Sequence, residues 1–462
     1  MKTCRSSLLQ TALVTSLGYV VVQLDVTIVN VALPTFAKVF QADMSALQWI
    51  PDAYVIVFAA LLLAAGGLSD RFGSRMVNLT GMVIFLFSSL ICAFSSSIDI
   101  MIAGRVGQGI GAALILPSSL ALLSAASQGN AVLRTKAIGW WSAIGGIISA
   151  AGPFIGGLIL EHYSWHALFL VNIPICIAGI IFTLYFIPEP PHYQSQRTDT
   201  KGILIFIVAS FSLVFVLISS GKPSVYTLSD LMIIVLFLFS SIQLFRHIRN
   251  NDYAFIPPIL LRTPIFFMGL ILGAAMNFSF YGSIFLLTIY FQVYRGFSPV
   301  MTGLALLTFT IIALANTASG YLSERFGARL TITAGLATAS VTYIILAFLV
   351  YTDASYLTFV CFLFLMPIGG GIALPTLISA FIHASPTDKT ATASAAINAM
   401  RQIGGAIGVA LLGLLVSDLH FSVGVGTTIG FLIAAFIMLA TAFLTYAKFY
   451  KLDPERISHD HE

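Results

Sequence analysis

Residues 66–75 read GGLSDRFGSR, and residues 320–329 read GYLSERFGAR. The two decapeptides share seven of their ten residues, although charged residues make up only 9% of the chain. Two further echoes lie at nearly the same separation: GAALILP at 111–117 with GGGIALP at 369–375, and IGG at 144–146 with IGG at 403–405. Repetition at a fixed offset indicates an internal duplication.

The composition around these repeats is that of a membrane protein. Hydrophobic residues make up 58% of the 462 residues, and the mean hydropathy is +0.97, whereas about a quarter of an ordinary globular domain is charged. Apolar runs of about 20 residues, the length that a helix needs to cross a bilayer, recur along the whole chain. We predict fourteen spans, at 8–33, 46–67, 77–97, 101–123, 136–159, 167–187, 202–221, 228–245, 264–290, 300–321, 331–351, 356–380, 392–415 and 424–446.

The decapeptides fix the organisation of these spans, because each copy lies at the end of a span, the second and the tenth. Spans one to six and nine to fourteen are therefore predicted to be related six-helix bundles of an all-α integral membrane fold, with two additional helices inserted between them. Paired six-helix halves are typical of alternating-access transporters. We divide the chain into a first bundle at 1–187, a cytoplasmic linker at 188–201, two inserted helices and a loop at 202–263, and a second bundle with a short cytoplasmic tail at 264–462.

The basic residues predict the orientation. Seventeen of the 22 lysines and arginines fall in the tails and loops on one side of the fourteen spans. Basic residues gather on the cytoplasmic side, so we expect a multi-pass plasma-membrane protein with both termini in the cytoplasm. The formal charge of +4 reflects this topology and gives no reason to expect nucleic acid binding. The four cysteines, in the N-terminal tail or within spans, predict no disulfide framework.

Several motifs resemble one transporter family in their order and placement. Gly66, Asp70, Arg71, Gly73 and Arg75 match the loop signature of the major facilitator superfamily. LDVTIVNVALP at 24–34, RVGQGIGAA at 105–113 and GPFIGG at 152–157 resemble signatures of its fourteen-span drug:proton antiporter branch, and the likeness continues in YFQVYRGFSPVMTG at 290–303 and NAMRQIGGAIG at 398–408. The resemblance covers nearly the whole chain.

This resemblance implies a multidrug-resistance-type exporter. Such a protein is a secondary active transporter and not an enzyme; it needs no cofactor, because a proton gradient drives it. Its expected partners are a small-molecule substrate, protons and the lipid bilayer, and we expect a monomer. The resemblance also implies that the loop residues gate the transport cycle, here Gly66, Asp70, Arg71, Gly73 and Arg75 with Glu324 and Arg325 of the second copy. The plain structural alternative is a tight turn with arginines that hold the loop in the cytoplasm.

Asp25 is the leading candidate for proton coupling. It lies about 12 Å from the nearer end of its span, where an unpaired charge is costly. Its helical face is otherwise apolar, and burial disfavours the charged form of a carboxyl group, so Asp25 could exchange a proton. A lipophilic cation would meet apolar walls and one negative charge, and would compete with the proton. A permanent, purely architectural ion pair is the alternative.

Arg105 is the expected partner of Asp25, because both lie in the outer half of their spans. Arg105 and Gln108 share one face of the fourth span. We assign Asp25, Arg105 and Asp52 to proton and substrate coupling. Asp52, near the outer start of the second span, is either a second acid of this cluster or a wetted residue at a helix start.

The fifth span combines small residues with a helix-kinking proline, at Gly152, Pro153, Gly156 and Gly157. Its resemblance to the antiporter signature favours export over uptake, and a simple packing face is the alternative. We assign Gln108, Asn398, Arg401 and Gln402 to the substrate cavity. Arg401, deep in its span, is either a charge that moves between partners or an anion-binding group. The few polar residues of the tenth span favour monovalent or neutral substrates.

One departure from the family pattern introduces a titratable group. His166 stands in SWHALFLVNIP at 164–174, where the family usually has arginine. With Glu161 and His162 it could sense pH, or the three could be solvated loop residues. No metal-ligand spacing, nucleophilic triad or phosphate loop occurs, so no metal is expected. Three functions stay open: proton-driven multidrug export, dedicated export of one metabolite or siderophore, and a non-transporting membrane sensor.

Overall fold

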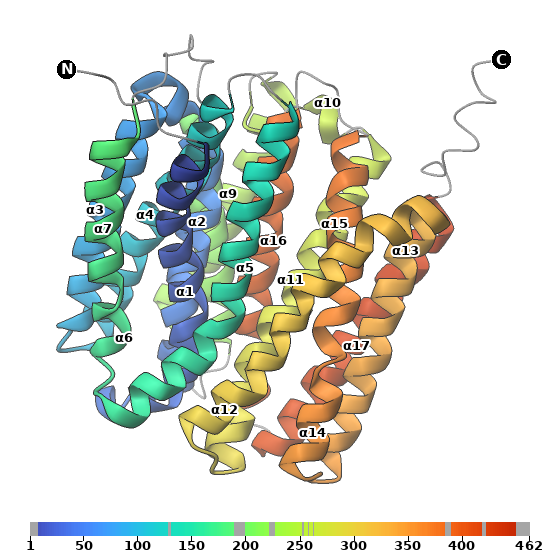
Figure 1. The fold of residues 1–462 in the computed structure, drawn as a ribbon. Coiled ribbons are helices and arrows are strands. Elements are labelled where there is room, and N and C mark those ends of the chain that lie inside the picture. The colour runs from blue at the N-terminus through green and yellow to red at the C-terminus, as the bar shows by residue number, and fades with distance from the viewer. Residues whose placement is uncertain are drawn as a thin grey trace. The chain divides into compact units, whose positions relative to one another are not determined.

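The computed structural model describes residues 8–127, 131–188, 199–220, 227–251, 254–256, 258–261, 263–383, 390–417 and 422–449 (Figure 1). Their regular secondary structure is helical. The first seven helices are α1 (Leu8–Phe40), α2 (Met44–Phe72), α3 (Ser74–Ala93), α4 (Ile98–Ala126), α5 (Ala131–His162), α6 (Ala167–Leu170) and α7 (Asn172–Phe186). They are followed by α8 (Thr200–Ser219), α9 (Leu228–Asn250) and the short α10 (Pro258–Leu261).

The later helices complete the chain and include two non-α turns. They are α11 (Pro264–Ile289) with the π-helical η1 (Tyr290–Tyr294), α12 (Pro299–Leu306) with the 3₁₀-helical η2 (Leu307–Ile311), α13 (Ile312–Tyr351), α14 (Tyr356–Leu363), α15 (Met366–His383), α16 (Thr390–Leu414) and α17 (Val423–Lys448). The predicted linker at 188–201 falls largely outside the described residues, as do the N-terminal tail and the last thirteen residues.

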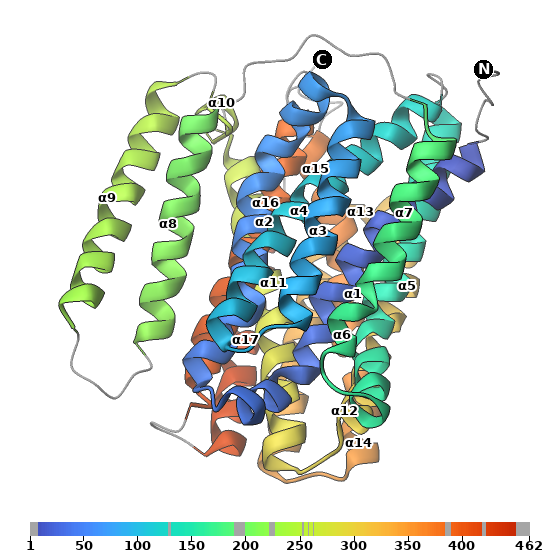
Figure 2. The same cartoon turned by 90° about the vertical axis from the view of Figure 1, so that its left-hand side faces the viewer.

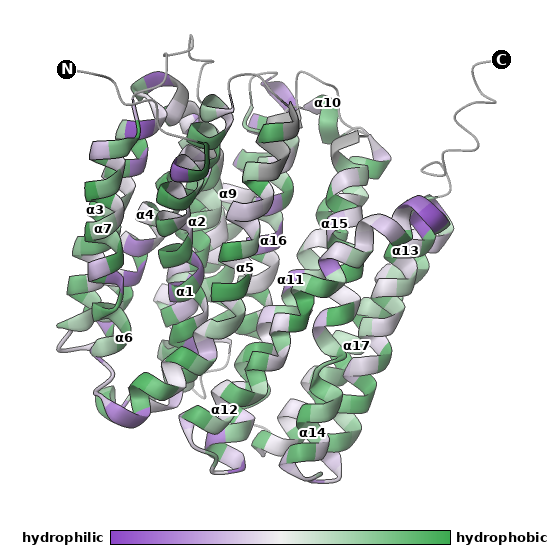
Figure 3. Cartoon of the chain, viewed as in Figure 1, coloured by the Kyte–Doolittle hydropathy of each residue, from purple (hydrophilic) through white to green (hydrophobic). Residues whose placement is uncertain are grey.

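The described residues contain 13 segments that are long and apolar enough to cross a membrane. Apolar residues predominate along these helices (Figure 3). One segment, Pro299–Tyr351, is 53 residues long and is interrupted at Gly327, where φ is 78°. A straight helix of that length would be about 80 Å long, enough for two crossings. The predicted spans at 300–321 and 331–351 both lie within it. The predicted all-α membrane fold is confirmed, and the protein is a multi-pass integral membrane protein.

The chain forms two compact units. The first comprises residues 1–213, 231–247 and 297–304, and the second comprises 214–230, 248–296 and 305–462. In the first unit α1 packs mainly on α5, and α4 packs on both α2 and α3. In the second unit α11 packs on α16, and α13 packs on α15 and α17. The boundaries predicted from the sequence, at 187, 201 and 263, remain a prediction.

The inserted helices α8 and α9 lie side by side (Figure 2). One end of this pair is fastened by His247, whose Nε2 lies 2.8 Å from Asp199 Oδ1. Asp199 also accepts the backbone N–H of Gly202 at 2.9 Å, which caps the start of α8. Thr227 and Asp230 form a capping box at the start of α9. Side-chain caps of this kind are also seen at α2, where Asp43 accepts from the backbone N–H of Ala46.

The duplicated decapeptides adopt the same local structure. Gly73 separates α2 from α3 with φ 88°, and Gly327 interrupts α13 with φ 78°. Such angles are readily reached only by glycine. Two residues later an arginine binds the carboxyl end of another helix of its own unit: Arg75 Nη2 donates to the Leu184 carbonyl at 2.8 Å, and Arg329 Nε donates to the Tyr446 carbonyl at 2.8 Å. A positive charge is favourable at a helix carboxyl end. The repeated letters therefore encode one turn and one helix cap, used twice.

The second sequence echo also has a structural counterpart. A Cβ on Gly111 of GAALILP would lie 2.8 Å from the Gly81 carbonyl oxygen, and one on Gly335 would lie 2.7 Å from that of Gly369, in GGGIALP. The helix pairs α3–α4 and α13–α15 therefore approach at backbone distance through glycines at corresponding positions. Close approach through small residues is the usual way in which membrane helices pack.

Candidate functional site

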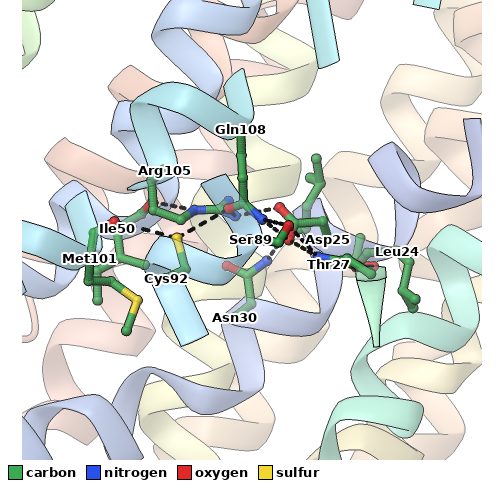
Figure 4. Close-up of polar contacts among 12 residues, drawn as sticks. Leu24, Asp25, Thr27, Asn30, Ile50, Ser89, Cys92, Met101, Arg105 and Gln108 are labelled. Carbon is green, nitrogen blue, oxygen red and sulfur yellow. Dashed lines mark hydrogen bonds and ion pairs between the residues drawn. The ribbon is translucent and has the colours of Figure 1, made fainter. Parts of the chain in front are cut away.

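Asp25, in the middle of α1, is the centre of a buried polar cluster in the first unit (Figure 4). Arg105 Nη1 on α4 donates to Asp25 Oδ2 and forms an ion pair with it. Gln108 Nε2 on α4 and Asn172 Nδ2 on α7 each donate to Asp25 Oδ1 at 2.8 Å. Asp25 and both amides have essentially no exposed surface. Helices α1, α4 and α7 therefore all contribute directly to this carboxylate.

Arg105 is held by three further groups. Its Nε donates to the Ile50 carbonyl on α2 at 3.1 Å, and its Nη1 donates to Gln108 Oε1 at 2.7 Å. The ring of Tyr54, also on α2, lies 4.5 Å from the guanidinium carbon. A cation over an aromatic ring is attracted by the ring quadrupole, more strongly where water is excluded. The arginine therefore has partners other than Asp25 in this conformation.

The amides of Gln108 and Asn172 are positioned by α3. Ser89 Oγ accepts from Gln108 Nε2 at 2.9 Å and from Asn172 Nδ2 at 3.3 Å. Cys92, one turn further along α3, points its thiol at Gln108 Oε1, with Sγ 3.5 Å away. The Oδ1 atom of Asn172 is buried and has no hydrogen-bond partner in the described structure. Few buried polar atoms are left in that state.

The cluster is electrically balanced, because one carboxylate faces one guanidinium. Breaking such a buried pair from one side costs about 3–5 kcal/mol, since it leaves an uncompensated charge. Only a change that neutralises Asp25, such as protonation, removes the ion pair without leaving a bare anion.

Asp52, on α2, is the other buried acid of the first unit. It is fully buried, and neither carboxyl oxygen has a hydrogen-bond partner in the described structure. It therefore lies in the interior instead of at a wetted helix start. No hydrogen bond or ion pair described here joins it to Asp25 or Arg105.

The expectation of apolar walls around Asp25 was wrong. The neighbours on its own helical face are apolar, but other helices deliver Arg105, Gln108 and Asn172 to it. Sequence reasoning named Arg105 and Gln108 and missed Asn172, Ser89 and Tyr54. The one available signal for Asn172 was an amide inside the apolar run LFLVNIPI, because polar residues in a span usually face the protein interior.

The fifth-span glycines bring α5 against the part of α1 that follows Asp25. A Cβ at Gly156 would lie 2.8 Å from Ile28 Cγ1, and one at Gly152 would overlap the Thr27 side chain. A Cβ at Gly157 would lie 2.6 Å from the carbonyl oxygen of Pro299, in the 297–304 segment that belongs to the same unit. Pro153 lies within the unbroken helix α5. Any residue with a side chain at these glycines would push α5 away from α1.

The predicted gating residues lie at the helix ends already described. Arg71 and Arg325 occupy corresponding positions, each with its guanidinium carbon over the ring of the next residue, at 5.1 Å from the Phe72 centroid and 5.3 Å from the Phe326 centroid. Arg325 Nη1 also donates to the Tyr321 hydroxyl at 3.2 Å, and Glu324 is exposed. The side chains of Gly66 and Asp70 lie outside the described part of the structure.

The remaining predicted cavity residues lie on α16, in the second unit. Arg401 Nη1 donates to Asn398 Oδ1 at 3.0 Å, and its Nε donates to Asn277 Oδ1 on α11 at 3.4 Å. Arg401 and Gln402 are partly exposed. The structure therefore brings Asn398 to Arg401, whereas Gln108 belongs to the Asp25 cluster of the first unit.

The titratable residues near the α5–α6 connection form no comparable cluster. Glu161 and His162 are exposed, and His166 is partly exposed, with its ring stacked on Trp165 at 3.9 Å. Within the described ranges, no group of three or more His, Cys, Asp or Glu side chains could hold a metal ion.

Comparison with known proteins places these features in a family. The profile described as Major Facilitator Superfamily matches residues 15–409. The methylenomycin A resistance protein of Bacillus subtilis (strain 168) is 33% identical over 437 residues, covering 93% of this chain and 91% of that protein. The multidrug resistance protein Stp of Mycobacterium tuberculosis (strain CDC 1551 / Oshkosh) is 32% identical over 409 residues, covering 88% of this chain and 75% of that protein.

The fold is likewise shared with solved transporters. The crystal structure of a D-xylose–proton symporter superposes with a TM-score of 0.71, covering 97% of this chain and 99% of that one, at 14% sequence identity. Identity this low establishes the common fold alone. With the family profile matched over most of the chain and resistance proteins among its relatives, this protein is a secondary transporter of the major facilitator superfamily and not an enzyme.

Proposed function

We propose that this transporter exports small molecules from the cytoplasm in exchange for protons, by alternating access. Asp25 is the group that binds the proton, and Arg105 is the partner that senses it. The observation that carries the proposal is the fully buried Asp25–Arg105 pair, an ion pair in the middle of a span with donors from α4 and α7 around it. Ionisable groups at such depth are costly and are typical of proton pathways.

The geometry suggests how a proton would change the site. A proton on Asp25 removes the negative charge that Arg105 faces. Arg105 then keeps the Ile50 carbonyl, Gln108 Oε1 and the Tyr54 ring as partners. The ion pair that joins α1 to α4 is lost, while the arginine is not left bare. A contact present in one protonation state and absent in the other is what a two-state transport cycle requires.

Asp52 is a candidate for a second proton position. An ionised carboxyl group with no partner is strongly unfavourable in an apolar interior. Both oxygens of Asp52 are in that situation here. Asp52 therefore either carries a proton in this conformation or meets a partner in another one.

The contact between α5 and α1 supports exchange of substrate for protons. Gly152 and Gly156 pack directly on Thr27 and Ile28, within one turn of Asp25. A change at Asp25 that moves α1 must therefore move it against α5. We infer export as the direction from the resistance proteins among the relatives, with both termini cytoplasmic as the basic residues indicate.

The relatives' names include one antibiotic in one case and multiple drugs in the other. Broad export of drugs or toxic amphiphiles is the first proposal, and dedicated export of one compound is the second. A resistance profile across chemically different compounds distinguishes them, because only the first predicts protection against several classes.

The test is exchange in proteoliposomes that contain the purified full chain and a pH-sensitive dye. A transported compound should move protons in the opposite direction, and Asp25→Asn should abolish this movement. The expected loss is at least about 100-fold, the size expected for removing one member of a buried charge pair. Thermal unfolding and membrane insertion of the variant report whether the protein still folds.

Two results would contradict the proposal. The first is compound movement by Asp25→Asn with undiminished proton exchange. The second is transport by the natural protein that is indifferent to the pH gradient. Asn78→Leu is a matched control, because Asn78 is equally buried in the first unit but bonds to Ser118 and the Ile115 carbonyl instead of Asp25.

A further inference from the structure

The second unit contains a cationic cluster that the proton-exchange proposal leaves unused. We define the Arg401 cluster as Asn277 and Tyr281 on α11 with Asn398 and Arg401 on α16. Asn277 and Tyr281 are one turn apart on α11, and Asn398 and Arg401 are three residues apart on α16, so each pair lies on one helix face. The hydrogen bonds from Arg401 to both asparagines show that the two faces meet.

Close packing of α11 on α16 fixes the cluster. A Cβ at Gly404 or Gly408 would overlap the backbone of Ala274 or Phe278. On the neighbouring stripe, a Cβ at Gly273 would lie 2.9 Å from Arg401 Cγ. The arginine stem therefore lies in a slot that glycine makes available, and the guanidinium is held at a defined position.

The bonds that position Arg401 do not cancel its charge. Both acceptors, Asn277 Oδ1 and Asn398 Oδ1, are neutral amide oxygens. Arg401 also interacts electrostatically with Tyr281, whose phenol is neutral at ordinary pH. These three neighbours orient the guanidinium and leave a full positive charge near the middle of α16.

The sequence offers no acid at the same depth in this unit. Residues 264–449 contain four acidic residues, and all lie at or beyond the ends of the helices: Glu324, Asp353, Asp388 and Asp418. Arg401 is about 15 Å from either end of α16 by helical rise. The first unit differs, because there Asp25 faces Arg105 directly.

We propose that the Arg401 cluster binds the anionic group of the transported molecule, so that the substrates are organic anions or zwitterions with a carboxylate or a group of similar geometry. Arginine suits this role, because its planar fork pairs with carboxylates in a bidentate manner. The partly exposed side chain is accessible to a ligand. This inference rests on the proposed export function and gives its substrate class. It also replaces the lipophilic cation expected from the sequence, because Arg105 already balances Asp25.

The test uses matched pairs of compounds that differ only in one carboxylate: rhodamine 110 with its methyl ester rhodamine 123, and 2-naphthoate with methyl 2-naphthoate. Binding to the purified full chain is measured by the shift in thermal unfolding. Each acid should bind at least about tenfold more tightly than its ester, as expected for a charge-assisted hydrogen bond. Arg401→Gln should abolish this preference, and Arg401→Lys should retain part of it because the charge remains.

Arg295→Gln is the matched control for the loss of one positive charge from the same unit. Arg295 donates to the Tyr290 hydroxyl and to the Ala354 carbonyl, near the end of α11. This variant should keep the preference for acids. Retained binding of the esters by Arg401→Gln shows that this variant is folded, and if it does not fold, Arg401→Lys with reduced preference carries the test.

Three outcomes would overturn the inference: no acid of either pair binds better than its ester, Arg401→Gln keeps the preference, or chloride and inorganic phosphate bind the cluster and the organic acids do not. Failure of the export proposal looks different. If acids bind through Arg401 but no compound moves protons, the anion site stands and proton exchange fails. If esters and acids exchange equally for protons, export stands and the anion site fails.

Discussion

At the scale of single residues, each of the two units holds one buried arginine in a different electrical setting. Arg105 faces the carboxylate of Asp25, whereas the acceptors that position Arg401 are the amides of Asn277 and Asn398. A charge that is already balanced suits a switch operated by protons. A charge positioned by neutral groups suits recognition of an external anion. The two arginines therefore divide the work that the sequence alone could not separate.

Asn172 gives a prediction at this scale. Replacing it with leucine removes the donor that lies 2.8 Å from Asp25 Oδ1. We expect compound–proton exchange to fall about tenfold or more, because hydrogen bonds to charged groups are the stronger ones. Asn78→Leu should cost a similar amount of stability, about 1–3 kcal/mol, without this loss of exchange. Exchange rates in proteoliposomes and thermal unfolding are the measurements, and equal exchange by both variants would refute the role of Asn172.

At the scale of elements, the contact of α5 with α1 links the glycine motif to Asp25. The helices touch through Gly152 and Gly156, which meet Thr27 and Ile28 just after the carboxylate. A glycine surface allows backbone to approach backbone, so a small movement of α1 is transmitted without slack. The motif is therefore both a packing face and a part of the coupling that we propose, and the two interpretations do not exclude each other.

Two glycines of α5 provide a test with an internal control. Gly156→Ala places a Cβ 2.8 Å from Ile28 Cγ1 and 2.9 Å from the Ile28 carbonyl oxygen, whereas Gly146→Ala meets nothing within 4 Å. We expect Gly156→Ala to destabilise the protein by about 1–3 kcal/mol through overpacking. Gly146→Ala should be neutral or stabilising by up to about 1 kcal/mol, because alanine favours helix. Unfolding in detergent compares the two, and exchange should suffer only in Gly156→Ala.

At the scale of the whole molecule, the internal duplication governs the backbone of both units. Gly73 and Gly327 make corresponding turns with positive φ, and Arg75 and Arg329 cap corresponding helices, α7 and α17. The chemistry placed on this repeated frame differs between the units. The duplication therefore preserves what builds the fold, and the function uses what has diverged.

The repeat predicts parallel effects of substitution in the two units. Gly73→Ala and Gly327→Ala should each cost about 1–3 kcal/mol, because a residue with a side chain is strained at these backbone angles. The costs should add in the double variant, since the glycines belong to different units. Gly320→Ala is the control within the second decapeptide, because a Cβ there meets nothing within 4 Å. If only one of the two glycines proved sensitive, the structural equivalence of the decapeptides would be wrong.

Much of the architecture could be predicted without coordinates, because its physical cause is local in the sequence. Apolar length predicts the spans, since a helix must cover the hydrocarbon with its own residues. The decapeptides predict the duplication, and the deeply placed Asp25 and Arg105 stand out in apolar runs. The long segment Pro299–Tyr351 shows the limit, because the turn at Gly327 is recognised through its likeness to Gly73 and not through a break in hydropathy.

The tertiary structure decided which polar groups meet. Asn172 lies 147 residues from Asp25 and Asn277 lies 124 residues from Arg401, and neither distance along the chain carries any signal of contact. The structure also decided that Asp25 is a balanced charge and Arg401 a charge positioned by amides, which reverses the expected charge of the substrate. The physical reason is that the stability of a buried charge depends on the groups packed around it, and those groups come from other helices.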